Sequence, residues 1–142
     1  MGYRILNHTA DIGVEVHGAT LVDIFYQAAL ALVDLLTDRA LLTGATEKII
    51  RIEGTDLEDL WINYLREVLY LFNGESFLLQ DVHRIAWEAN RATGLCLTAY
   101  CVGEIYNPRS HTINTEIKAV TYHRAEVKQT PVGWQCVFIV DV

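Results

Sequence analysis

Hydrophobic positions in this chain repeat with two different periods, one typical of helices and the other typical of strands. Two segments carry apolar side chains at helical spacing. The first follows Thr20, a suitable N-cap with Asp23 three residues on, and the second follows Asp56 and ends before Gly74. Each segment therefore predicts an amphipathic helix. The apolar faces comprise Leu21, Ile24, Phe25, Ala28, Ala29, Leu32, Val33 and Leu36 in the first, and Leu57, Leu60, Trp61, Tyr64, Leu65, Val68, Leu69 and Phe72 in the second.

Seven further segments predict β-strands, because apolar, β-branched and aromatic residues dominate them between turn-like breaks. They cover residues 3–7, 12–17, 46–53, 77–88, 95–104, 116–128 and 134–140, with boundaries set to within a few residues. Short breaks separate the last four segments, so we expect these strands to form an antiparallel meander. The predicted fold is a single α+β domain over residues 1–142, mainly an antiparallel sheet with both helices packed on one face.

Composition and charge argue against some classes of function. The net charge is −7, and the 11 Lys and Arg residues are scattered singly, which argues against tight autonomous binding of nucleic acid. The three cysteines lie in apolar, strand-like sequence and are expected to be buried thiols. No apolar run is long enough to span a bilayer or to form the core of a signal peptide, so we expect a soluble, cytoplasmic protein.

Catalytic signatures are missing from the sequence. It contains no nucleophile elbow of the Gly-x-Ser-x-Gly type, no phosphate-binding loop, no dinucleotide fingerprint and no His-Glu-x-x-His motif. Nothing in the sequence identifies a nucleophile.

The most informative candidates are two aspartates near opposite ends of the chain. Asp11 opens an alternating strand, and Asp141 closes an apolar one directly before the carboxylate of Val142. If the two strands are neighbours, the carboxylates repel unless water, a cation or a basic side chain lies between them. Such oxygen donors suit Ca²⁺, Mg²⁺ or Mn²⁺ better than zinc. The alternatives are a turn-forming Asp11 and a solvated Asp141.

Other polar residues are candidates for the surroundings of this site. His8 lies three residues before Asp11. It is a candidate metal ligand, a neighbour of the ligands or a general base, and the alternative is an ordinary loop residue. Glu104 ends a strand-like run and could line the same site, whereas turn chemistry around Asn107 and Pro108 explains the loop of His111 without any function. His17 and His83 show no supporting neighbours.

Lys118 lies in an alternating segment, residues 116–123, with neither face cleanly apolar. The alternation places Lys118 and Val120 on one face and Ile117 and His123 on the other. Lys118 either balances the acidic pair or binds an anion, or it is an edge lysine whose ammonium group reaches solvent.

Several motifs in this order resemble the archease family from end to end. They are His8-Thr9-Ala10-Asp11-Ile12-Gly13, Trp61-Ile62-Asn63, Gly103-Glu104, Glu116-Ile117-Lys118-Ala119-Val120-Thr121-Tyr122-His123 and Asp141-Val142. Archeases are small, non-catalytic proteins that activate the RtcB-type RNA ligase of tRNA splicing and RNA repair. They promote guanylylation of the ligase and its multiple turnover, and they hold a divalent cation near the two chain ends.

The resemblance implies specific roles in this chain. Asp11, Asp141 and Val142 would hold the metal, and His8, Glu104, Lys118 and His123 would lie near it or contact the partner. RNA would be met only through the ligase, and no membrane would be involved. Two other functions stay open: a small metal-dependent phosphoesterase or nuclease using the same carboxylates, and a folding modulator with a large exposed apolar patch.

Overall fold

The structure, a computed structural model, describes residues 2–7, 11–90, 92 and 94–142. The strands are β1 (Gly2–Asn7), β2 (Asp11–Gly18), β3 (Thr46–Gly54), β4 (Phe77–Asn90), β5 (Gly94–Ile105), β6 (Ala119–Thr130) and β7 (Gly133–Asp141). The helices are α1 (Leu21–Leu36), the short 3-10 helix η1 (Arg39–Leu41) and α2 (Leu57–Asn73). The α+β class is confirmed, and each predicted helix and strand is present.

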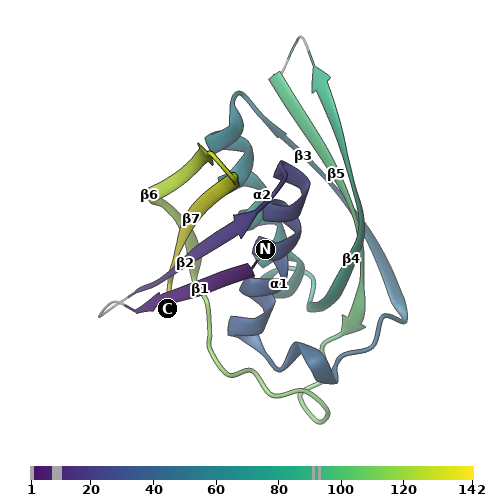
Figure 1. Ribbon diagram of the computed structural model, residues 1–142. Helices are drawn as coiled ribbons and strands as arrows, with labels where there is room; N and C mark the ends of the chain where they lie inside the picture. The colour runs from purple at the N-terminus through teal and green to yellow at the C-terminus, as the bar shows by residue number, and fades with distance from the viewer. Residues whose placement is uncertain (1, 8–10, 91, 93) are drawn as a thin grey trace.

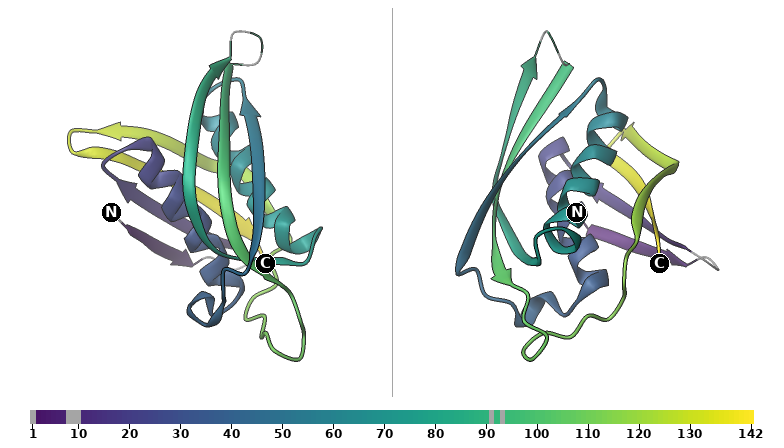
Figure 2. Two further views of the ribbon diagram at one scale, coloured as in Figure 1. Left: turned by 90° about the vertical axis from the view of Figure 1, so that its right-hand side faces the viewer. Right: turned by 180° about the vertical axis from the view of Figure 1, so that it is seen from behind.

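Two antiparallel sheets enclose the two long helices (Figures 1 and 2). The first sheet has the strand order β1-β2-β7-β6, and the second has the order β3-β5-β4. Helix α1 packs between β2 and β4, and helix α2 packs between β6 and β3. The expected meander of the last four strands is therefore wrong, because β5 and β6 belong to different sheets. We also expected the helices to cover one face of a single sheet, whereas they lie between two sheets and cover one face of each.

The composition of α1 explains why two sheets are needed. Every residue from Ala28 to Val33 is buried, so apolar side chains cover nearly the whole circumference of the helix. A helix that is apolar all round must be covered on more than one side. A single sheet would leave part of this apolar surface exposed to water, and the second sheet buries that part.

Both predicted helix starts are confirmed by their capping hydrogen bonds. The Thr20 hydroxyl accepts from the Asp23 N–H at 3.2 Å, and the Asp23 carboxylate accepts from the Thr20 N–H at 3.1 Å. The Asp56 carboxylate accepts from the Asp59 N–H at 2.9 Å. Each cap satisfies backbone donors that the first helical turn leaves unpaired.

Helix α2 is attached to both sheets by polar side chains. Four of its side chains each donate a hydrogen bond to a backbone carbonyl outside the helix. The pairs are Trp61 Nε1 with Val137 at 3.0 Å, Asn63 with Glu53 at 3.0 Å, Arg66 Nε with Val120 at 3.2 Å and Asn73 with Ile117 at 3.0 Å. Trp61 is also fully buried, with its ring edge-on to Phe25 and Phe138. The helix thus fixes the distance between the two sheets.

The segment of residues 106–118 crosses from the second sheet to the first. It is attached to the end of α1, where the Thr37 hydroxyl donates to the Thr112 carbonyl at 2.7 Å. His111 is nearly buried, and its Nε2 lies 3.1 Å from Glu104 Oε1. Its Nδ1 accepts from the Asn107 N–H at 2.8 Å, so the neutral ring carries its proton on Nε2 and donates it to Glu104. These contacts set where the chain enters β6.

Glu104 connects this crossover to the segment before β3. Its Oε2 accepts from the Thr43 N–H at 2.6 Å. That backbone hydrogen bond, with the smaller contribution of His111, lowers the pKa of Glu104 from its ordinary value of 4.5. The carboxylate form is therefore favoured in the folded protein.

Within the described residues, neither helix combines the length and the sustained apolar character needed to cross a bilayer.

Replacing Trp61 with phenylalanine should lower the free energy of unfolding by about 1–3 kcal/mol. The variant loses the hydrogen bond to Val137 and leaves unfilled volume between Phe25 and Phe138. Urea denaturation followed by far-UV circular dichroism measures the change. Trp134→Phe is the matched control, since Trp134 is only partly buried, and its midpoint should move less. Equal shifts in both variants would contradict the anchoring role of Trp61.

The lowered pKa of Glu104 predicts a pH-dependent contribution to stability. Because the folded-state pKa lies below the unfolded one, this stability is fully present above the ordinary pKa of 4.5 and is lost as pH falls through the folded pKa. Wild type should therefore lose more unfolding free energy than Glu104→Gln between pH 7 and about pH 3. Glu47→Gln, which changes an exposed carboxylate on β3, should follow the wild-type curve. Parallel curves for wild type and Glu104→Gln would refute this role.

Candidate metal centre

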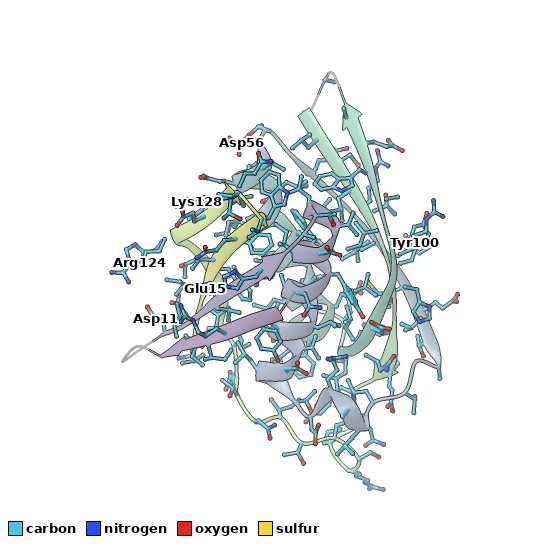
Figure 3. The ribbon with its side chains drawn as sticks, in the orientation of Figure 1. Asp11, Glu15, Asp56, Tyr100, Arg124 and Lys128 are labelled. Carbon is cyan, nitrogen blue, oxygen red and sulfur yellow. The ribbon has the colours of Figure 1, made fainter. Side chains whose placement is uncertain are left out.

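Asp11 and Asp141 lie directly opposite each other at the end of the first sheet. Strands β2 and β7 are antiparallel neighbours, and their register pairs Asp11 with Asp141. Ala119 of β6 flanks Asp141 on the other side. Directly opposed residues point to the same face, with Cβ atoms about 4.5–5.5 Å apart. Figure 3 shows Asp11 at the start of β2. The condition for convergence, that the two strands are neighbours, is therefore met.

Burial on the opposite face of the sheet sets this register. Val14 pairs with Phe138 and Val16 pairs with Cys136, and all four side chains are completely buried against the helices. A slip of one residue would turn these side chains to the outer face. The aspartates are held together by packing elsewhere in the strands.

The carboxylate of Asp11 has an oxygen atom without a partner. Among the described residues, Oδ1 of Asp11 is buried and accepts no hydrogen bond. A buried carboxylate oxygen left unpaired costs free energy, and a second carboxylate opposite it adds repulsion. A bound cation would relieve both penalties, so this atom fits a metal ligand.

Thr121 supplies a second unpartnered oxygen on the same face. It lies opposite Ile139, which in turn lies opposite Gly13, two residues from Asp11. By strand alternation, Thr121 therefore shares the face of the two aspartates. Its hydroxyl is buried and makes no hydrogen bond within the described part of the chain. Sequence reasoning missed this residue, because only the pairing of β6 with β7 brings it beside the acidic pair.

The two aspartates do not form a larger group of metal-binding side chains. Within the described ranges, no group of three or more His, Cys, Asp or Glu side chains is arranged to hold a metal ion. Val142 follows Asp141 directly and its side chain is exposed. His8 lies outside the described residues.

Glu15, on the same face of β2 as Asp11, is a carboxylate whose charge is paired with neighbouring side chains. Glu15 lies 3.1 Å from Arg4 Nη2 and 2.7 Å from His17 Nε2. The hydrogen bond from His17, followed by Arg4, lowers the pKa of Glu15. The expectation that His17 has no supporting neighbour is wrong, although the spacing of two residues along a strand was a readable signal. Unlike Asp11, Glu15 has its charge balanced.

Lys118 is attached to the acidic pair through its backbone. Its N–H donates to the Asp141 carbonyl at 2.8 Å, while its side chain is exposed. Strand β6 begins at Ala119, one residue after Lys118, so Ile117 lies outside the strand although it is buried, as Val120 within the strand is. The predicted alternation therefore starts at Ala119 and not at residue 116.

The other two candidates lie apart from these contacts. Glu104 belongs to the second sheet, where it binds Thr43 and His111. His123 is exposed in an irregular stretch of β6, where pairing with β7 is interrupted between Thr121 and Glu126. Arg124 in this stretch has a positive φ of 57°, and it projects away from the sheet (Figure 3).

Comparisons with known proteins agree with this architecture. An archease from Methanosarcina mazei is 37% identical over 142 residues, which cover 99% of this chain and 95% of the relative. The solution structure of Methanobacterium thermoautotrophicum protein 1598 has a TM-score of 0.82 and 27% identity, with 99% of each chain covered. A Thermotoga maritima crystal structure, described as an archease and possible chaperone, has a TM-score of 0.62 at 21% identity. It covers 96% of this chain and 94% of its own, and it shares the fold.

Residues 3–142 match the model of the archease protein family (MTH1598/TM1083). The match covers nearly the whole chain, including Asp11, Lys118 and Asp141. This chain belongs to the archease family.

Proposed function

We propose that this protein is a non-catalytic activator of an RtcB-type RNA ligase, acting in the cytoplasm in tRNA splicing and RNA repair. It would promote guanylylation of the ligase and its multiple turnover. The proposal rests on membership of the archease family and on one observation above all: Oδ1 of Asp11 is buried and has no partner among the described residues, and Asp11 lies opposite Asp141.

The site proposed for a divalent cation comprises Asp11, Asp141 and the carboxylate of Val142. A cation there would neutralise the facing carboxylates and offer open coordination positions to a ligand from the partner. Oxygen donors of this kind suit Ca²⁺, Mg²⁺ or Mn²⁺. In this proposal, the residues of this chain bind the cation and orient it toward the partner.

The chemistry of the described residues supports an activator over an enzyme. Burial raises the pKa of the Cys101 and Cys136 thiols to about 12, so neither forms a thiolate near neutral pH. His111 is held between Asn107 and Glu104 in the crossover, away from the contacts of the acidic pair. The alternative, a phosphoesterase or nuclease, would need the same carboxylates to activate water with no acid or base identified beside them among the described residues.

The exposed apolar residues give little support to a general chaperone role. In the described part of the chain, the large hydrophobic side chains that reach solvent are scattered over separate elements, not gathered in one. They include Ile5 on β1, Leu41 on η1, Ile49 on β3 and Val132 in the β6–β7 turn. A surface that holds unfolded chains needs a contiguous apolar patch. Docking on a specific partner fits this surface better.

Multiple-turnover ligation by the cognate RtcB-type ligase, with GTP and Mn²⁺, tests the proposal. The wild-type protein should stimulate ligation, and Asp11→Asn and Asp141→Asn should each reduce that stimulation by about tenfold or more, because each removes a charged donor. Asp38→Asn is the matched control, since Asp38 is exposed and its side chain makes no capping hydrogen bond.

The same assay includes this protein with RNA and no ligase. RNA cleavage in that reaction would favour the phosphoesterase alternative. Full stimulation by both aspartate variants would contradict the cation site, and no stimulation by wild type would contradict the activator role itself.

A further inference from the structure

A groove runs between the exposed side of α2 and the start of β6, with a volume of about 280 Å³. Both elements lie at the same edge of the first sheet (Figure 1). The lining residues are Arg66, Leu69, Tyr70, Asn73, Lys118, Ala119 and Val120. Leu69 and Val120 are buried and form an apolar floor, whereas the cationic and aromatic side chains at the rim are exposed.

The arginine at the rim is fixed in place before any ligand binds. Arg66 Nε donates to the Val120 carbonyl, and its guanidinium carbon lies 4.5 Å from the centre of the Tyr122 ring. Asn73 is fixed in the same way by its bond to the Ile117 carbonyl. Side chains that are already ordered lose less conformational entropy on binding, which increases the affinity that their contacts provide.

The charge of the groove is opposite to that of the molecule. The chain has a net charge of −7, yet none of the seven lining residues is acidic and two of them, Arg66 and Lys118, are cations. Such a surface selects carboxylates by charge complementarity. Arginine and tyrosine are also the residue types that contribute most binding energy at protein interfaces, and Tyr70 is 51% exposed at this rim.

The size of the groove favours side chains of a macromolecule. Pockets for small molecules usually have volumes of about 300–1,000 Å³ and enclose most of the ligand. This groove, at about 280 Å³, is slightly smaller, which suits one or two side chains of a docked segment. The scattered distribution of Lys and Arg elsewhere in the chain argues against a nucleic-acid track.

The groove is also continuous with the candidate metal centre. The Lys118 N–H donates to the Asp141 carbonyl, and Ala119 pairs with Asp141 across the sheet. A partner that reaches the two aspartates is therefore placed directly beside the groove.

We propose that the groove between α2 and β6 docks an acidic segment of the partner ligase. An apolar side chain of that segment would cover Leu69 and Val120, and its carboxylates would contact Arg66 and Lys118. This inference rests on the proposed function. In it, the groove provides affinity for the ligase, and the two aspartates are needed to activate the ligase.

The dissociation constant between the intact ligase and this protein tests the division of roles. Arg66→Glu and Lys118→Glu should each raise it by about tenfold or more, and stimulation by Arg66→Glu should return at saturating protein concentration. Lys118→Glu is the safer variant, because its side chain is exposed and its removal leaves the core unchanged. Arg51→Glu is the control: it makes the same charge change at an exposed position on β3 and should alter affinity less than about twofold.

Asp11→Asn separates this inference from the proposed function. It should lose stimulation while its dissociation constant stays within about threefold of wild type. Unchanged affinity in folded Lys118→Glu and Arg66→Glu, beside a wild type that stimulates, would overturn the docking groove alone. A wild type that neither binds nor stimulates the ligase would overturn both proposals.

A parallel titration with single-stranded RNA tests whether the groove binds phosphates instead of the carboxylates of a protein segment. No binding is expected at the protein concentrations that saturate the ligase. RNA binding that Arg66→Glu and Lys118→Glu abolish would assign the groove to phosphates and would overturn the docking of an acidic segment.

Discussion

The register between β2 and β7 is the constraint on which the rest of the structure depends. Val14 opposite Phe138 is buried against the helices in the middle of the first sheet. A slip of one residue would expose such side chains, at about 1.5–3 kcal/mol for each. This cost fixes Asp11 opposite Asp141, although the two carboxylates repel each other. Packing in the middle of the strands thus holds two acidic residues side by side, the exposed Asp141 and Asp11 with its buried Oδ1.

Most of the fold was predictable because its signals are local. Helix periods and N-caps such as Thr20 act within a few residues, and strand alternation extends over one strand. The division into two sheets was not predictable in this way, because it depends on the crossover of residues 106–118, which is held by distant contacts such as Thr37 with Thr112. The uninterrupted apolar run from Ala28 to Val33 was the one available sign that α1 needs cover on two sides.

The candidate site was predictable in part. Asp11 and Asp141 were identified because each adjoins an apolar strand, and the pairing of those strands brings them together. Thr121 was missed, since its place beside them depends on the pairing of β6 with β7. The regular alternation predicted from residue 116 begins only at Ala119, because the chain before β6 is irregular. Whether a carboxylate is paired also depends on the folded structure: on one face of β2, Glu15 is paired with Arg4, whereas Asp11 has an oxygen without a partner among the described residues.

The central claim is that the acidic pair binds a divalent cation, and paramagnetic broadening by Mn²⁺ in NMR spectra of the ¹⁵N-labelled protein tests it most directly. Mn²⁺ should selectively broaden amide signals of residues 11–13, 118–121 and 139–142 and leave those of β3 sharp. The effect should disappear in Asp11→Asn. Broadening that is centred elsewhere, or that persists in both Asp11→Asn and Asp141→Asn, would contradict the assignment of the cation to this site.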